Sequence, residues 1–414
     1  MYDLKIVGGT VVDGTGGERF SADVGVVGGV ITEIGRCDGA AKRTIDAKGA
    51  IVAPGFVDLH THYDGQISWD EELAPSSIHG VTTCAMGSCG VGFAPVHESD
   101  RDKLVELMEG VEDIPGTALS EGIRWNWQSF PEYMNALDQM PHTIDFLAHV
   151  PHDALRVYVM RERAVHDEKA TPDDIERMRA IVREALLAGA AGFSTGRSDN
   201  HRSAIGEWTP SSEADATELE GIARAFVGLN HGVLQAVSDF NILHGDAHFE
   251  PEWNVLERML RAGGGRPMSV STMQRDHSPK QYQWIMERAQ RCVDDGFDVR
   301  CQVASRGIGV MLGLQATFHP FMGYPSYKKI AHLSLDERVR ITQSVSKRET
   351  TRRKSLNRLP ATEANSHLSP ISFFKTFVRS PMRLFQLSEN PNYEPTMLES
   401  LGVQARQVNA SVFK

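Results

Sequence analysis

The sequence predicts an α/β protein in which a small glycine-rich β-lobe precedes a longer region of alternating strands and helices. Short apolar segments separated by glycines fill the first fifty residues, which is typical of a small antiparallel sheet. From Pro54 onward, apolar runs of the parallel-strand type alternate with amphipathic stretches, and this alternation indicates a βα-repeat. The length of 414 residues is sufficient for one large α/β domain with an extra lobe.

The elements of the N-terminal lobe are short strands. A Gly28-Gly29 pair separates the second predicted strand from the third and marks a tight turn between antiparallel neighbours. The predicted strands are 4–12, 23–27, 30–34, 44–45 and 50–52.

The βα-repeat region contains seven countable strands and no identifiable eighth. The predicted strands are 55–60, 80–86, 144–150, 191–195, 232–237, 267–272 and 298–303. Helices are expected between them at 171–188, 213–230 and 279–295. The first of these opens with Thr-Pro-Asp-Asp, which supplies an N-cap, a proline in the first turn and first-turn acids.

Composition excludes several classes of partner. With 43 basic and 54 acidic residues the formal net charge is −11, which argues against binding to nucleic acid. The basic segment 347–358 is interpreted as a solvated helical face or linker. The start has no signal-peptide pattern and no stretch reaches the ~18 apolar residues of a membrane span. An odd set of five cysteines favours a reducing compartment, so a cytoplasmic location is expected.

The sharpest local motif is His60-Thr61-His62, at the point where an apolar strand meets a polar loop. Residues two apart on a strand project to the same face, so both imidazoles can reach one point. Neutral imidazole is a common ligand of zinc and similar metals, and the C-terminal ends of barrel strands hold such sites. The alternative is a chance His-x-His on a loop.

Cys89 lies in a glycine-rich segment, Gly87–Gly92, just past the next predicted strand. Glycines there permit unusual backbone geometry, and the thiolate would be a third metal ligand. The alternative is a buried structural cysteine, because free cysteine is among the most buried residue types.

Several longer runs together resemble the N-acyl-D-amino-acid deacylases (D-aminoacylases), a branch of the metal-dependent amidohydrolase superfamily. The most specific run is VAPGFVDLHTHYDG at 52–65. It is followed by PSS at 75–77, GVTT at 80–83, GSCG at 87–90, MEGVEDIPG at 108–116, GFST at 192–195 and NYEP at 392–395. The likeness therefore extends over nearly the whole chain.

This resemblance implies a distorted TIM (β/α)8 barrel joined to a β-sandwich. Residues 1–53 would be the N-terminal part of the sandwich, and residues 54–414 the barrel. The missing eighth strand and the missing returning sandwich strands predict a C-terminally truncated barrel.

The resemblance also implies an activity, the hydrolysis of a linear amide bond in an N-acyl-D-amino acid by a water that zinc or another divalent metal activates. Cys89 matches the cysteine that bridges the metals in the family, so the metal ligands expected are His60, His62 and Cys89. Asp58 is expected to orient a metal-bound histidine or water. The strand-eight aspartate that would transfer the proton is expected beyond residue 414.

Two departures from the family pattern bear on the metal site. The histidines usually found at the ends of strands five and six are absent from 234–239 and 269–274, so one ion is expected rather than two. Three histidines in nearby loops could take their place as ligands: His244, His248 and His277. Three other side chains could supply weaker oxygen ligands: Gln235, Asp239 and Gln274.

The expected partner is a small-molecule substrate, an N-acyl amino acid, with no nucleic acid and no membrane; a homo-oligomer is left open. An arginine fork suits the free carboxylate of such a substrate. The candidate substrate-binding residues are Asp64, Arg197, His201, Gln235 and Arg306, and His152 has a weaker claim.

Two alternatives to the deacylase stay open. One is a cyclic amidase of the dihydroorotase or hydantoinase type, which Cys89 in place of a strand-four lysine disfavours. The other is a truncated, catalytically inactive amidohydrolase-like protein. Unpaired edges on the first and seventh strands of an open barrel would predict poor solubility in that case.

Overall fold

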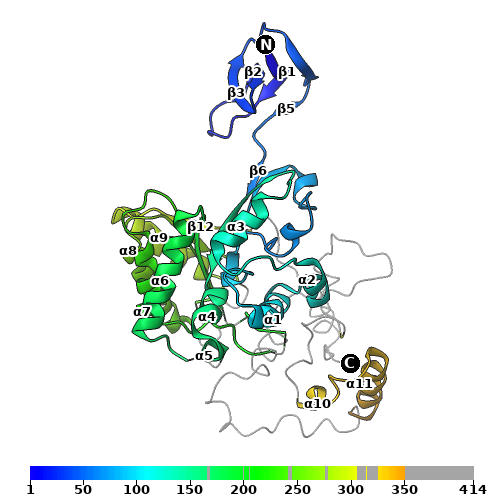
Figure 1. Cartoon of the computed structure of the whole chain (residues 1–414), viewed down its shortest axis with the longest axis vertical. Coiled ribbons are helices and arrows are strands. Elements are labelled where there is room, and N and C mark those ends of the chain that lie inside the picture. Colours follow the sequence, from blue (N-terminus) through cyan, green and yellow to red (C-terminus); the bar gives the residue numbers. More distant parts are fainter. Residues whose placement is uncertain are drawn as a thin grey trace. The chain divides into compact units, whose positions relative to one another are not determined.

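The structure is a computed structural model that describes residues 1–165, 168–198, 200–204, 206–240, 245–275, 278–304, 314 and 325–349 (Figure 1). The chain divides into two compact units. One unit comprises Met1–Leu59, Glu72–Cys84 and Thr143–Phe146, and the other comprises His60–Glu71, Ala85–His142 and Leu147–Lys414.

The N-terminal sheet has five strands in the order β3-β2-β1-β4, with β5 also pairing with β1. Its strands are β1 (Tyr2–Val11), β2 (Phe20–Val27), β3 (Val30–Gly35), β4 (Ala41–Asp46) and β5 (Ile51–Val52). All five predicted strands are therefore present, and the Gly28-Gly29 turn joins β2 to β3.

The prediction that this sheet is antiparallel is wrong in part, because β4 and β5 run parallel to β1. After β3 the chain crosses to the far edge of β1 instead of forming another hairpin. The Lys5 ammonium holds this crossing, since Nζ donates to the carbonyl oxygens of Cys37 at 3.0 Å and Gly39 at 2.9 Å.

The larger sheet has seven strands in strict sequence order, and every pairing with a defined register is parallel. Its strands are β6 (Phe56–Asp58), β7 (Val81–Met86), β8 (Asp145–Pro151), β9 (Gly192–Arg197), β10 (Val233–Ser238), β11 (Met268–Ser271) and β12 (Val299–Gln302). These are the seven predicted strands, which confirms the α/β class. The segments 305–313, 315–324 and 350–414, where an eighth strand was sought, lie outside the described residues.

Helices connect the strands. They are α1 (Arg101–Glu112), α2 (Gly116–Gly122), α3 (Phe130–Asp138), α4 (His152–Met160), α5 (Glu162–Val165), α6 (Pro172–Leu187), α7 (Ala216–Ala223), α8 (Phe249–Ala262), α9 (Gln281–Asp294), α10 (Pro325–Lys328) and α11 (Leu335–Glu349). The neighbours α6, α7 and α8 lie along one flank of the sheet (Figure 1).

Capping residues set the ends of the predicted helices. The Thr171 side chain accepts from the Asp174 amide and the Asp174 side chain accepts in return from the Thr171 amide, so α6 begins where the sequence predicts. The helix expected at 213–230 is shorter, because Asp215 caps α7 and a single 3-10 turn, Arg224–Phe226, follows it.

The core of the larger unit lies around the central strands. All residues of β9 are buried, and β10 is buried except for its first residue, as expected for parallel strands covered on both faces. Trp253 of α8 is fully buried and packs on Phe240 and Phe249 at ring-centroid distances of 6.0 and 6.2 Å. Within the described ranges, no helix has both the length and the apolar character needed to cross a lipid bilayer.

Candidate metal centre

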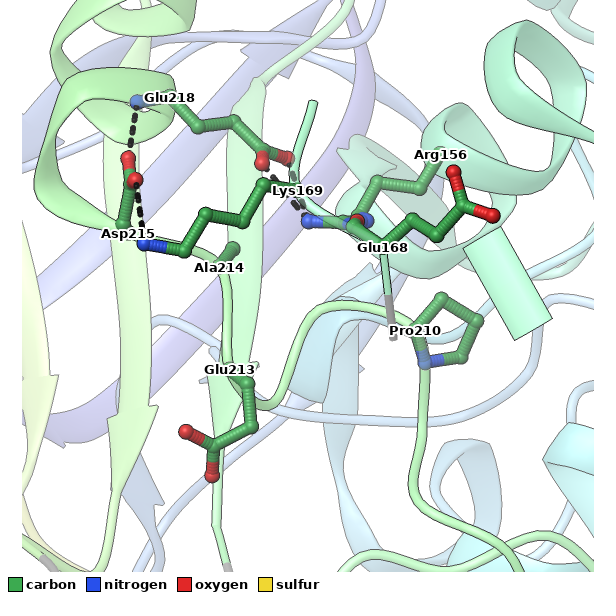
Figure 2. A pocket seen from close by; sticks show the side chains of 8 residues that line it. All are labelled: Arg156, Glu168, Lys169, Pro210, Glu213, Ala214, Asp215 and Glu218. Carbon is green, nitrogen blue, oxygen red and sulfur yellow. Dashed lines mark hydrogen bonds and ion pairs between the residues drawn. The ribbon is translucent and has the colours of Figure 1, made fainter. Parts of the chain in front are cut away.

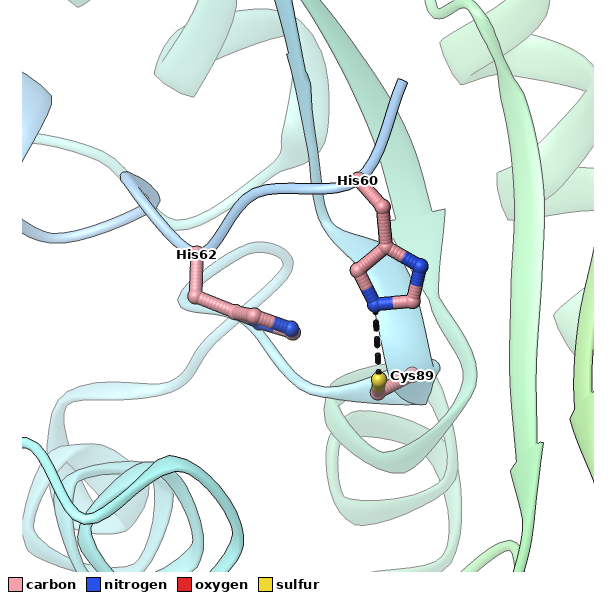
Figure 3. Close-up of side chains that lie close together, drawn as sticks. All are labelled: His60, His62 and Cys89. Atoms are coloured by element: carbon pink, nitrogen blue, oxygen red, sulfur yellow. Dashed lines mark hydrogen bonds between the residues drawn. The ribbon is translucent and has the colours of Figure 1, made fainter. Parts of the chain in front are cut away.

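Three side chains converge at the C-terminal ends of the first strands of the larger sheet. His60 and His62 follow β6, and Cys89 lies in the turn after β7. One ligand atom from each of the three lies within 4.8 Å of the others (Figure 3). His60 Nε2 is 3.1 Å from the Cys89 Sγ, and the rings of His60 and His62 meet edge to face with centroids 5.4 Å apart.

The residue between the two histidines explains why they share a face. The Thr61 amide and its hydroxyl both donate to the Ala85 carbonyl oxygen, at 2.9 and 2.8 Å, which fastens this segment to β7. Because Thr61 is turned toward Ala85, the side chains on either side of it project the other way. On its far side His60 Nδ1 lies 2.7 Å from Gln302 Oε1 at the end of β12, which fixes the ring orientation.

The Cys89 turn depends on close backbone approach. Cys89 itself has a φ of 57°, in the left-handed region that costs a non-glycine residue on the order of 1 kcal/mol. A Cβ at Gly196 of β9 would lie 2.0 Å from the Cys89 carbonyl oxygen, so only glycine admits the turn. The Gly90 amide donates to Ser194 Oγ at 3.1 Å and completes the attachment to β9.

A fourth side chain, Glu112 at the end of α1, reaches the same cluster. Its Oε1 lies 3.2 Å from His62 Nε2, and its charge lies near the Cys89 thiol. Sequence reasoning missed Glu112, although it lies inside the MEGVEDIPG run. The available signal was an acidic residue in the middle of that run, and nothing local places it beside Cys89.

Burial dominates the electrostatics of the cluster. It lowers the pKa of His62 well below the usual range, so the imidazole is neutral and able to bind a metal. Burial, followed by the nearby charge of Glu112, raises the pKa of Cys89 well above that of a free thiol. A divalent cation would reverse this effect by stabilising the thiolate. Two imidazoles, a thiol and a buried carboxylate therefore fit a zinc-like ion.

Further buried polar groups surround the cluster. His149 of β8 and His201 both have a pKa lowered to about 4, chiefly by burial and also by the charge of His60. Asp64 and Asp153 both have a pKa raised to about 7, chiefly by burial. These two carboxyls and the two imidazoles each keep one buried polar atom without a hydrogen-bond partner among the described residues, as expected where water, an ion or a ligand would bind. Of this group, His201 and Asp64 were sequence candidates, whereas His149 and Asp153 were not.

Arg197 does not face an open pocket as expected. Its guanidinium is buried at the end of β9, where Nη2 donates to Glu252 Oε2 at 3.0 Å, Nε donates to Oε1, and Nη1 donates to the Ala214 carbonyl. The fork that was assigned to the substrate carboxylate is therefore engaged by Glu252 of α8. The arginine forms an internal ion pair, and its assignment to the substrate carboxylate stays a prediction.

Other candidates differ in placement. Gln235 of β10 is buried with both amide atoms unpaired among the described residues, whereas Asp239 accepts from the Ser198 hydroxyl at 3.0 Å. His248 is exposed in the turn Asp246–His248. Gln274 lies after β11. The remaining candidates, His244, His277 and Arg306, lie outside the described residues.

Asp58, which is predicted to orient a metal-bound histidine or water, is the last residue of β6 and pairs in register with Cys84 of β7.

His152 belongs to a different buried network. Its Nε2 and the Arg156 guanidinium both contact Glu218, at 2.9 and 2.7 Å. Figure 2 shows Arg156 and Glu218 beside a small pocket that Lys169 and Asp215 also line. His152 Nδ1 is bound to Thr195 at 2.9 Å, so both ring nitrogens have partners within the fold. The weak claim of His152 to a substrate role is not supported by this placement.

Comparison with known proteins finds a matching family profile and several relatives. The profile of the amidohydrolase family matches residues 43–346. A D-aminoacylase of Alcaligenes xylosoxydans xylosoxydans is 34% identical over 196 residues, which cover 47% of this chain and 38% of that protein. The chain thus matches less than half the length of this relative.

Two solved structures of such enzymes share the fold. A structure of D-aminoacylase with a binuclear metal centre superposes with a TM-score of 0.60 at 28% identity, covering 74% of this chain and 59% of that one. A structure of N-acyl-D-glutamate deacylase from Bordetella bronchiseptica, complexed with zinc and a phosphonate inhibitor, gives a TM-score of 0.55 at 28% identity with the same coverage.

Proposed function

Because the chain belongs to the amidohydrolase family, we propose that it is a metal-dependent hydrolase of linear amide bonds that deacylates N-acyl-D-amino acids. The observation that carries the proposal is the convergence of His60, His62 and Cys89 within 4.8 Å. The similarity to a D-aminoacylase and to a zinc-containing N-acyl-D-glutamate deacylase supports the substrate class and its stereochemistry.

We assign one zinc or similar divalent ion to His60, His62 and Cys89. Two nitrogen donors and one sulfur donor suit zinc, and three protein ligands leave a position open for water or substrate, as in catalytic sites. When bound, such an ion supplies an activated water and polarises the scissile carbonyl. One ion is favoured over two because β10 and β11 end in Ser238 and Ser271, without histidines at their ends.

The residues of the chain itself would orient the donors and the substrate. Gln302 holds the His60 ring by its Nδ1, which leaves Nε2 directed at Cys89. Asp64, His201 and Gln235 carry buried polar atoms that have no partner among the described residues, so they are proposed to contact the substrate. Asp58 is proposed to orient a metal ligand or water.

We also propose a finer architecture. Residues 1–53 would be part of a β-sandwich, and residues from 54 onward a distorted (β/α)8 barrel to which strands β6 to β12 belong. The five-stranded sheet and the strict sequence order of the seven parallel strands support this division.

The test uses the purified full chain loaded with zinc. We expect release of acetate from N-acetyl-D-amino acids, little turnover of the L-enantiomers, and zinc near one equivalent by elemental analysis. His60→Ala and Cys89→Ala should lose both the metal and the activity. His79→Ala, an exposed histidine, and Cys292→Ala, a cysteine in α9, are the matched controls and should keep both.

Three results would contradict the proposal. Exclusive turnover of hydantoins or dihydropyrimidines would favour the cyclic amidase. Stoichiometric metal without hydrolysis of any amide would favour a non-catalytic protein. Unchanged metal content in both His60→Ala and Cys89→Ala would refute the site itself.

A further inference from the structure

Glu112 stands out among the buried polar groups because its carboxylate touches one of the proposed metal donors and lies near a second. Its Oε1 is 3.2 Å from His62 Nε2, and its charge acts on the nearby Cys89 thiol. Glu112 comes from α1, about fifty residues after the His-x-His motif, so its position is a product of the fold and not of a local motif.

The separations match those of donors around one ion. Atoms that share a zinc ion at ~2.0–2.3 Å in tetrahedral geometry lie roughly 3.3–3.6 Å from one another. His62 Nε2 and Glu112 Oε1 are 3.2 Å apart, and His60 Nε2 and Cys89 Sγ are 3.1 Å apart. Both pairs are within a few tenths of an ångström of that range.

The fold holds the end of α1 firmly at this place. Asp113 closes the helix in the left-handed conformation, with its amide donating to the Glu109 carbonyl at 3.0 Å. At Gly110 a Cβ would lie 2.2 Å from the Arg202 carbonyl oxygen, so the helix packs directly on the backbone that follows β9. The Ala204 amide also donates to the Glu106 carbonyl at 3.1 Å. The backbone of Glu112 is therefore held in place, so little conformational entropy is lost when its side chain faces His60, His62 and Cys89.

The sequence provides a reason for such a carboxylate. The ends of β10 and β11 carry no histidine, and among the described residues the 4.8 Å grouping comprises His60, His62 and Cys89, which Glu112 reaches from outside through His62. Carboxylate oxygen is an ordinary zinc ligand alongside histidine and cysteine.

We propose that Glu112 is a donor of the metal centre, supplying a carboxylate from α1 in place of the histidines absent from the ends of β10 and β11. This inference rests on the proposed function, since it needs a metal at His60, His62 and Cys89. Zinc in catalytic sites extends from four to five ligands, so a position remains for water or substrate.

Zinc affinity distinguishes a donor from a residue that only orients one. Losing a hydrogen-bonding partner outside the donor set typically weakens metal binding by 10- to 100-fold. We therefore expect Glu112→Gln, which keeps the shape and removes the charge, to weaken zinc binding more than 100-fold in competition with a chromophoric chelator. Glu109→Gln, one turn earlier on the same helix, is the matched control and should stay within threefold of the wild type.

Cobalt substitution supplies a second readout that does not depend on activity. The visible absorption bands of Co²⁺ respond to its ligand set and geometry, and the thiolate charge-transfer band reports Cys89. In Glu112→Gln the visible bands should change while the thiolate band persists. Circular dichroism of each variant excludes misfolding as the cause.

The outcomes separate the inference from the proposed function. Weakening of zinc binding by 100-fold or less, or an unchanged cobalt spectrum, would overturn the role of Glu112 while the deacylase proposal stands. A wild-type chain that binds neither zinc nor cobalt would overturn the metal centre, and with it both proposals.

Discussion

The buried ion pair between Arg197 and Glu252 makes a strong prediction about stability. Arg197 is 8% exposed and Glu252 is 4% exposed, and their side chains are joined by two hydrogen bonds. Replacing Arg197 with Met would leave the Glu252 carboxylate buried without its partner. Removing one member of a buried pair costs about 3–5 kcal/mol, because the remaining charge is uncompensated. We expect Arg197→Met to lower the free energy of unfolding by this amount.

Urea denaturation followed by far-UV circular dichroism and tryptophan fluorescence measures this loss. Trp253 is next to Glu252 in α8 and is fully buried, so its emission reports the same region. The double variant Arg197→Met with Glu252→Gln should recover part of the loss, because no charge is then stranded. The control is Arg258→Met, which breaks an exposed pair with Glu220 and should cost at most about 1 kcal/mol.

The result also tests what Arg197 does. If it bound the substrate carboxylate, its replacement would raise the KM for an N-acyl amino acid and leave stability nearly unchanged. A loss of stability below about 1 kcal/mol, together with a higher KM, would refute the assignment of Arg197 to an internal ion pair.

Three further predictions follow from single groups. Thr171→Ala removes the cap of α6 and should lower the free energy of unfolding by about 1 kcal/mol, measured by the urea midpoint; Thr171→Ser should retain most of it, and equal losses in both would contradict the capping role. Asp153, whose pKa is raised to about 7 from 3.8, binds its proton more tightly when folded, so wild-type stability should fall as the pH rises from about 4 through 7. Asp153→Asn should flatten this pH profile by up to roughly 4 kcal/mol, and an identical slope in both proteins would argue against it. Removing metal with a chelator should destabilise the wild type by about 2.7 kcal/mol relative to zinc at 100 times its Kd, and should not affect Cys89→Ala; equal effects on both would place the metal elsewhere.

The strands and several helices were predictable because their signals are local. Apolar runs alternating with amphipathic stretches identified all seven strands of the larger sheet, and Thr-Pro-Asp-Asp identified the start of α6. The parallel direction of β4 was not predictable, since it depends on the crossing that Lys5 of β1 holds through its contacts with the segment after β3.

The candidate site was likewise predictable only in part. His60, His62 and Cys89 belong to short motifs at strand ends, so the convergence that the sequence predicts needs only the parallel order of neighbouring strands. Glu112 and His149 come from other elements, and no spacing in the sequence places them at this point.

Arg197 shows why the rest required the tertiary structure. The sequence places it just after the fourth strand of the larger sheet, whereas it is the last residue of β9, and no local signal predicts its contact with Glu252, 55 residues further along the chain. By itself the sequence determined the α/β order of the elements and the nitrogen and sulfur donors at the strand ends. Only the tertiary structure decided which charges are buried together, since desolvation and pairing depend on contacts between segments that are far apart in the chain.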